Sequence, residues 1–236
     1  MILQVADEIP FYGYRKIALQ LKKVFGVGTS FKRIYRLCQE LGIRAVRLPI
    51  PTSTPHTAHA VYPYLLRNKE ITYANQVWQT DITYLRFPQG TIYLATIIDV
   101  YSRKVLAWNI SNTMDVLLVL LPLTWALERY GMPEIINTDQ GSQYTSEDWI
   151  CMIEDLGIRV SMNGKNRSID NIYIERWWRS FKYEDYYLNQ YSGVPELRKG
   201  IGEYVRFYNQ ERFHQALDYH CPDEVFFGTE ELEQAV

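Results

Sequence analysis

Three acidic residues stand where carboxylates from different elements can meet at one point. Asp81 lies in a strand-like segment (WQTDITYL), Asp139 follows another (IINTDQGSQY), and Glu175 lies in a helical segment (IYIERWWRSF). No Cys or His accompanies them, so the cluster would offer only hard oxygen ligands, which suit Mg²⁺ or Mn²⁺ better than zinc. Two such ions can activate a nucleophile and stabilise the leaving oxygen in phosphoryl displacement. Without cations the clustered carboxylates would repel one another, so we expect a metal-dependent site.

Each acid also has a simpler interpretation. Asp81 could be a hydrogen-bonded strand residue, Asp139 a turn former, and Glu175 a solvated residue on a helix surface. The spacing favours a common site, because 35 residues separate Asp139 from Glu175 and Lys182 follows seven positions later. In a continuous helix Glu175, Arg179 and Lys182 share one face. The two bases could contact DNA phosphates there, or they could simply pair with Glu175.

The elements that would position these acids alternate in type along the chain. Strand-like patterns cover 77–85, 91–100, 104–110, 134–137 and 158–162, and helical patterns cover 114–130, 145–157, 171–186 and 195–214. This order, β-β-β-α-β-α-β-α with one further helix at the end, predicts an α/β domain with a mixed five-stranded sheet flanked by helices. Two further acids are interpreted as structural: Asp99 as a partner of Arg103, and Asp170 as the N-cap of the helix that carries Glu175.

The first 50 residues differ in charge from the rest of the chain. They hold nine Lys or Arg and three Asp or Glu, a charge of +6, whereas the whole chain carries −2. Helical periodicity over Tyr14–Val24 and over 31–41 predicts two helices separated by Gly26 and Gly28. Apolar residues of the second helix form a predicted stripe of Phe31, Ile34, Tyr35, Cys38 and Leu41. Its basic residues, Lys32, Arg33 and Arg36, lie off that stripe. This pattern predicts a helix-turn-helix-like DNA-binding module, and a plain helical hairpin is the alternative.

Composition limits the remaining possibilities. Three prolines among small polar residues at 48–60 indicate a linker, so we place a basic module at 1–48, a linker at 49–72 and the catalytic core with its C-terminal helix at 73–236. The three cysteines are far apart and show no zinc-ligand spacing, which favours a reducing cytosol. The apolar run at 116–127 is too short to span a bilayer, so no membrane association is expected.

Several stretches resemble one known family. They are YGYRKI at 12–17, VWQTDITYL at 77–85, IIDVYSRKVLAW at 97–108, NTDQGSQYTS at 137–146, the segment 161–184, and FYNQERFHQAL at 207–217. Together they resemble the OrfB-type transposases of the insertion sequence three family and, more broadly, the retroviral-integrase-like recombinases with a DDE motif. By comparison with the family we expect the basic module at 1–48, the head of the chain, to be a shortened DNA-binding module, and Phe213 stands where members often have Pro.

The resemblance implies an RNase H-like fold, with Asp81, Asp139 and Glu175 as ligands of two Mg²⁺ ions, or Mn²⁺ in their place. It implies DNA as the partner, both as insertion-sequence ends and as target. It also implies a homo-multimer on DNA, an upstream-frame transposase protein that joins it, and a place at the bacterial nucleoid in the cytoplasm. Two alternatives stay open: a degenerate remnant that binds element DNA without catalysis, and an RNase H-like nuclease that does not join strands.

Overall fold

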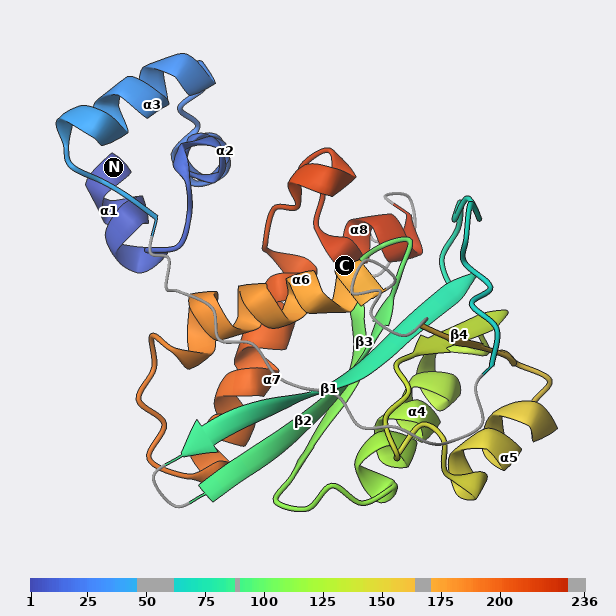
Figure 1. Cartoon of the computed structure of the whole chain (residues 1–236). Coiled ribbons are helices and arrows are strands. Elements are labelled where there is room, and N and C mark those ends of the chain that lie inside the picture. The colour runs from blue at the N-terminus through green and yellow to red at the C-terminus, as the bar shows by residue number, and fades with distance from the viewer. Residues whose placement is uncertain (46–61, 88–89, 164–170, 229–236) are drawn as a thin grey trace. The chain divides into compact units, whose positions relative to one another are not determined.

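The chain forms two compact units, and each is described by itself. The computed structural model describes residues 1–45, 62–87, 90–163 and 171–228 (Figure 1). One unit comprises Met1–Pro55 with Arg179–Gln190, and the other comprises His56–Trp178 with Tyr191–Val236. Within the described residues, no helix combines the length and apolar character that a membrane crossing requires.

The first unit contains three helices from the basic head. They are α1 (Ile2–Glu8), α2 (Tyr14–Phe25) and α3 (Phe31–Glu40). Gly26 ends α2 in the left-handed conformation at φ 66°, which an L residue with a side chain rarely adopts. The side chain of Ser30 caps α3 by accepting a hydrogen bond from the backbone N–H of Arg33 at 3.3 Å. The two predicted helices are therefore confirmed, and α1 is an addition that the periodicity did not predict.

The buried face of the head is narrower than the sequence predicts. Ile34 and Cys38 of α3 are buried, whereas Tyr35 is 50% exposed and Phe31 39% exposed. Val24 of α2, expected on the apolar stripe, is 57% exposed. Three short helices can bury only a narrow stripe of each helix against the others, so the apolar residues beside that stripe stay at the surface.

The second unit is built on a mixed five-stranded sheet with the order β3-β2-β1-β4-β5. The strands are β1 (Val77–Phe87), β2 (Gly90–Asp99), β3 (Val105–Ser111), β4 (Ile135–Thr138) and β5 (Arg159–Met162). β2 pairs antiparallel with both β1 and β3, β4 pairs parallel with β1, and β5 pairs parallel with β4. This arrangement confirms the predicted sheet and its element order.

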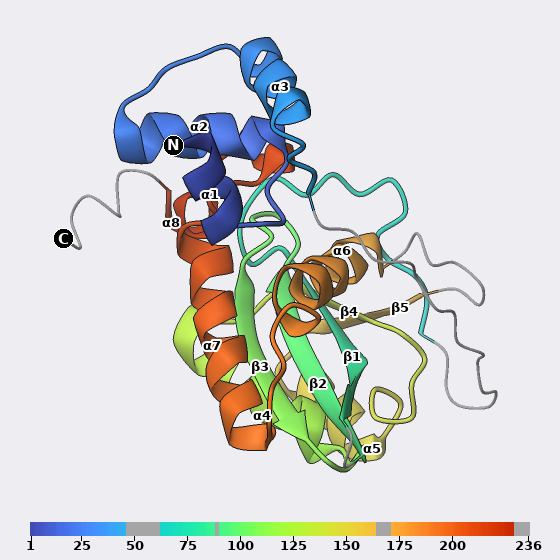
Figure 2. The same ribbon diagram turned by 90° about the vertical axis from the view of Figure 1, so that its left-hand side faces the viewer.

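Helices cover both faces of the sheet, as Figures 1 and 2 show. On one face, α4 (Leu117–Tyr130) and α5 (Glu147–Asp155) bury apolar residues with Trp78, Ile97 and Ile136 of the strands. On the other face lie α6 (Ile172–Phe181) and α7 (Val194–Gln210), where Trp177 of α6 packs edge-on against Tyr208 of α7 with ring centroids 4.7 Å apart. The α6 helix continues into a π-helical turn at Lys182–Tyr186, which belongs to the first unit.

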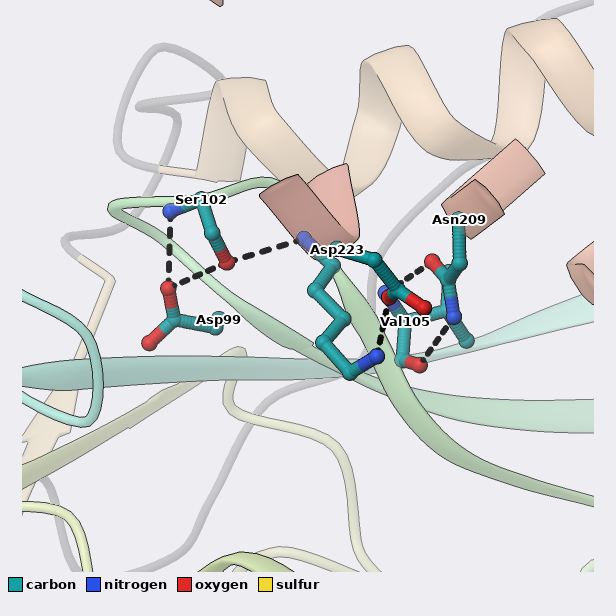
Figure 3. Close-up of polar contacts among 6 residues, drawn as sticks. Asp99, Ser102, Val105, Asn209 and Asp223 are labelled. Atoms are coloured by element: carbon teal, nitrogen blue, oxygen red, sulfur yellow. Dashed lines mark hydrogen bonds and ion pairs between the residues drawn. The ribbon is translucent and has the colours of Figure 1, made fainter. Parts of the chain in front are cut away.

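The turn between β2 and β3 anchors the C-terminal helices (Figure 3). The carboxylate of Asp99 accepts hydrogen bonds from the backbone N–H and the hydroxyl of Ser102, both at 2.7 Å. The amide of Asn209, on α7, bonds the backbone N–H and C=O of Val105, each at 2.9 Å. Asp99 is thus structural, as predicted, although the hydrogen bonds come from Ser102 and Asn75. Arg103 stacks over Tyr173 at 3.8 Å from the ring centroid.

A buried ion pair fixes the last described helix, α8 (Pro222–Phe227). Lys104 Nζ pairs with the carboxylate of Asp223, and its ammonium lies 4.8 Å from the ring centroid of Phe227 and 5.4 Å from that of Tyr130. This helix was not predicted, and the helix predicted at 195–214 ends at Gln210 instead. Asn209 fixes that end of α7 on β3, and the backbone N–H of Arg212 then bonds the carbonyl of Phe207 at 2.8 Å.

Two predictions fall wholly or partly outside the described residues. Asp170, the predicted N-cap, is one of them. The predicted linker at 49–72 is described only from Tyr62 onward, where the chain lies on the second unit. There the Tyr62 hydroxyl donates to Glu154 at 2.9 Å, and the backbone N–H of Leu65 donates to Ser161 at 3.0 Å.

Candidate active site

The long strand β1 presents Asp81 beneath α6. Side chains alternate along a strand, so Val77, Gln79 and Asp81 share the face that α6 covers, while Trp78 points into the core on the other face. β4 pairs with β1 only as far as Gln79. Asp81 therefore lies just past the point where the neighbouring parallel strand ends, a position typical of functional residues in mixed sheets.

Asp139 follows the end of that neighbouring strand, β4. Its Oδ1 accepts a hydrogen bond from the backbone N–H of Gly141 at 2.9 Å. A Cβ atom on Gly141 would lie 2.9 Å from the same oxygen, so a side chain there would displace the carboxylate of Asp139. The amide of Gln140 donates to the carbonyl of Asn163 at 2.7 Å and holds the turn against the end of β5. Asp139 thus forms a turn, as the simpler interpretation of the sequence proposed, and the same hydrogen bond fixes the orientation of its carboxylate.

Glu175 lies in the first turn of α6, and its side chain is exposed. Two hydrogen bonds fasten this helix to β1. The backbone N–H of Ile174 donates to Gln79 Oε1 at 3.3 Å, and the indole N–H of Trp178 donates to Asp81 Oδ2 at 2.8 Å. Gln79 is completely buried, so its carbonyl takes up a backbone donor that the first turn of a helix leaves unpaired.

Besides burial, the pKa of Asp81 reflects the charge of Asp139 and, more weakly, that of Glu175. Burial is the largest cause that raises the pKa of Asp81 to about 7, followed by the charge of Asp139, and Glu175 adds a smaller increase. Hydrogen bonds from Trp178 and from the backbone of Ile82 act in the opposite direction. Burial also raises the pKa of Asp139, which the Gly141 hydrogen bond opposes, and the pKa of Glu175. Asp81 and Asp139 are therefore the strongly interacting pair of like charges, and Glu175 interacts with Asp81 only weakly.

The donor set fits a hard divalent cation in chemistry and charge. All its ligand atoms would be carboxylate oxygens, and a cation would remove the repulsion between Asp81 and Asp139. Among the described residues, however, no set of three His, Cys, Asp or Glu side chains is spaced to hold an ion. Asp81 and Asp139 form the close pair, and Glu175 stands farther out on the exposed side of α6.

A buried amide network beneath the site was not predicted from the sequence. Asn137 Nδ2 donates to Asn163 Oδ1 at 2.9 Å and to Asn171 Oδ1 at 3.4 Å, and the hydroxyl of Ser161 donates to Asn137 Oδ1 at 2.8 Å. These side chains join the ends of β4 and β5 to the residue before α6. A signal for it exists in the sequence, because Asn137 interrupts an apolar strand directly before Asp139.

The bases predicted to flank Glu175 lie where the helix changes. Arg179 is exposed on α6, with its guanidinium 6.0 Å from the ring centroid of Tyr183. Lys182 opens the π-helical turn, so the seven-residue spacing from Glu175 no longer follows α-helical geometry. In the part of the chain that the structure describes, Glu175 forms no ion pair, so the simple intrahelical pairing is not observed.

The predicted DNA-contacting bases of the head lie on α3. Lys32, Arg33 and Arg36 are all exposed, opposite the buried pair Ile34 and Cys38. Arg36 also forms an exposed ion pair with Glu40 at 3.5 Å. Such a surface pair contributes little to stability and leaves the guanidinium accessible to a partner.

Comparison with known proteins identifies the family. Models of the integrase core domain match residues 72–168 and 156–222, and a model of an HTH-like domain matches residues 2–49. The transposase InsF for insertion sequence IS3A of Escherichia coli (strain K12) is 36% identical over 143 residues, which are 59% of this chain and 50% of the relative. The transposase for insertion sequence element IS904 of Lactococcus lactis subsp. lactis (strain IL1403) is 31% identical over 221 residues, which are 87% of this chain and 85% of the relative. The chain belongs to the OrfB-type transposases of the insertion sequence three family.

Solved structures confirm the fold of this transposase. The catalytic core domain of HTLV-2 integrase, in complex with magnesium, aligns with a TM-score of 0.54 at 18% identity, over 65% of this chain and 97% of that one. The catalytic core domain of BIV integrase aligns with a TM-score of 0.52 at 17% identity, over 68% and 99%. The predicted RNase H-like sheet with its N-terminal helix-turn-helix-like module is therefore confirmed, and the domain is of the polynucleotidyl-transferase kind.

Proposed function

We propose that this transposase cuts and joins DNA at insertion-sequence ends with a metal-dependent site formed by Asp81, Asp139 and Glu175. The observation that carries the proposal is the pairing of two partly buried carboxylates, Asp81 within β1 and Asp139 just after the end of the adjacent β4, with a third acid on the helix that lies over β1. Their raised pKa values indicate charge that a cation would compensate.

Two Mg²⁺ ions, or Mn²⁺ in their place, would activate the nucleophile and stabilise the leaving oxygen at this site. Asp81 and Asp139 would bind from the sheet, and Glu175 would complete the ligand set from α6. In the first reaction water would attack a phosphodiester at the element end and break its P–O3′ bond, which leaves a 3′-hydroxyl on one side and a 5′-phosphate on the other. In the second reaction that 3′-hydroxyl would attack a phosphodiester of another strand and displace a 3′-hydroxyl from it. Because both reactions are in-line displacements, one set of carboxylates can serve both.

The basic residues would hold the DNA rather than do the chemistry. Lys32, Arg33 and Arg36 on the exposed face of α3 suit phosphate or groove contacts by the helix-turn-helix-like module. Arg179 and Lys182, which follow Glu175, suit phosphates next to the cleaved bond. We place the module at 1–48, the linker at 49–72 and the catalytic core at 73–236.

Transposition requires more than one chain. Two element ends must be held at once, so we propose a homo-multimer assembled on DNA in the cytoplasm, at the bacterial nucleoid. An upstream-frame protein that adds a DNA-reading domain is proposed as the second partner.

The test is a joining assay on labelled element-end DNA titrated with Mg²⁺. We expect metal-dependent cleavage followed by strand joining. Cleavage of RNA–DNA hybrids without any joining would instead favour the nuclease, and binding to end DNA without metal-dependent cleavage would favour a non-catalytic remnant.

A further inference from the structure

One hydrogen bond connects the acid on the sheet to the helix that carries Glu175. The indole N–H of Trp178 donates to Oδ2 of Asp81 at 2.8 Å. Trp178 is only 7% exposed and lies three positions after Glu175, so both residues are on the same turn of α6. Burial of an aromatic ring would explain a large apolar residue at this position, but it does not explain why a polar N–H points at the carboxylate.

A second bond shows that the contact belongs to a fixed register between strand and helix. The side chain of Gln79 accepts a hydrogen bond from the backbone N–H of Ile174. Gln79 lies two residues before Asp81 on β1, and Ile174 lies four residues before Trp178 on α6. Two residues of strand advance by about 6.6 Å and four residues of helix by about 6 Å, so the two spacings nearly match. Both bonds can therefore form at once when α6 lies along β1, and together they fix the place of Glu175.

We propose that Trp178 is a positioning residue: its indole N–H orients the Asp81 carboxylate for cation binding and makes that orientation depend on the docking of α6. This inference rests on the proposed metal site. It assigns to the side chain of Trp178 a part in assembling the site from two separate elements.

The chemistry of the carboxylate supports this role. A carboxylate offers about four lone-pair positions, so Oδ2 can accept the indole N–H while Oδ1 remains available to a cation. The indole carries no charge and therefore does not compete with the cation, as Lys or Arg in the same place would. Hydrogen bonds of this kind to metal-binding groups typically contribute 10- to 100-fold in metal affinity.

The test is a titration of the metal-free full chain with Mn²⁺ in the absence of DNA, followed by the electron paramagnetic resonance signal of free Mn²⁺. Trp178→Phe keeps a ring and removes the donor, so we expect its Kd for Mn²⁺ to rise roughly 10- to 100-fold. Trp177→Phe is the matched control: it is the same change one residue earlier on α6, at a ring buried against Tyr204 and Tyr208. Its Kd should stay within about twofold of wild type.

A second variant separates the hydrogen bond from the packing. Replacing Trp178 with benzothienylalanine keeps the bicyclic shape and substitutes sulfur for the N–H, so it should weaken Mn²⁺ binding as Trp178→Phe does, with an unchanged circular dichroism spectrum. Wild-type affinity in this variant would overturn the inference while leaving the metal site intact. Asp81→Asn tests the proposed metal site separately from the role of Trp178, because loss of Mn²⁺ binding in this variant supports the site itself. Failure of the wild-type chain to bind Mn²⁺ would overturn both proposals.

Discussion

The charge of Asp139 raises the pKa of Asp81, its neighbour across the end of β4. Burial is the larger cause, and the two effects together bring the pKa of Asp81 to about 7. A buried pair of like charges is unfavourable by itself, and it becomes favourable when a cation binds between the two groups. This relationship explains why the site should require metal.

The metal-free protein should lose stability as the pH rises. Asp81 titrates at about 7 in the folded chain and near 3.8 when unperturbed, so the folded state holds an extra proton between these values. The free energy of unfolding must then fall with pH between about 4 and 7, and the shift of Asp139 has the same sign.

Asp81→Asn removes this titration. At pH 8 in EDTA it should increase the free energy of unfolding by on the order of 1–3 kcal/mol, and the Tm should rise accordingly. Asp155→Asn, at an exposed residue of α5, is the control and should leave the Tm unchanged. An Asp81→Asn protein less stable than wild type under these conditions would contradict the electrostatic interpretation.

Gly141→Ala should damage the site without damaging the fold. The new Cβ would meet Asp139 Oδ1 at 2.9 Å, so the carboxylate must turn away and lose its hydrogen bond from the backbone. The Mg²⁺ concentration for half-maximal joining should rise by roughly tenfold or more, as a titration of the joining reaction would measure. Gly202→Ala on α7, where the nearest atom is an ordinary 3.7 Å away, should behave like wild type.

The ion pair between Lys104 and Asp223 should behave as a unit in stability measurements. Lys104→Met leaves a buried carboxylate without its cation and should cost about 3–5 kcal/mol in urea unfolding. The double variant Lys104→Met/Asp223→Leu should recover most of that loss, because neither charge remains buried. Additive losses in the double variant would show that the pair is not the interaction that fixes α8.

Removing the exposed bases of α3 should weaken DNA binding in a salt-dependent manner. Changing Lys32, Arg33 and Arg36 to Ala should lower affinity for end DNA and reduce the slope of log K against log[salt] by about one for each lost phosphate contact. Fluorescence anisotropy at several salt concentrations measures both quantities. Lys199→Ala, at an exposed base of α7 that pairs with Glu203, is the control, and an equal effect there would argue against a specific role for α3.

The sequence predicts well those elements whose periodicity is long. The strands of the sheet and the helices α4 to α6 were expected close to their observed bounds. The short helices α1 and α8 were not expected, because six or seven residues give too little periodicity to separate a helix from a loop. For α8 a local signal exists in Pro222 at its first turn, followed by Asp223 and Glu224.

The acidic residues of the site could be predicted from the sequence, whereas the contacts between distant residues could not. Asp81, Asp139 and Glu175 could be selected from their types and spacing, and in the structure Asp81 interacts strongly with Asp139 and weakly with Glu175. The bond from Trp178 to Asp81 joins residues 97 positions apart, and it depends on the register of α6 on β1. No local pattern carries that register, so the sequence alone does not predict a contact between Trp178 and Asp81.

The central claim is that Asp81, Asp139 and Glu175 together perform the cutting and joining. The most direct measurement is the rate of strand joining on element-end DNA by Asp81→Asn, Asp139→Asn and Glu175→Gln, with Asp155→Asn as the control and DNA affinity measured for each. We predict a loss of roughly a thousandfold or more in each of the three, because bound metal ions contribute several kcal/mol of transition-state stabilisation. DNA affinity should persist in all of them, and the control should join strands like wild type. Joining at the wild-type rate by Asp139→Asn would contradict the account.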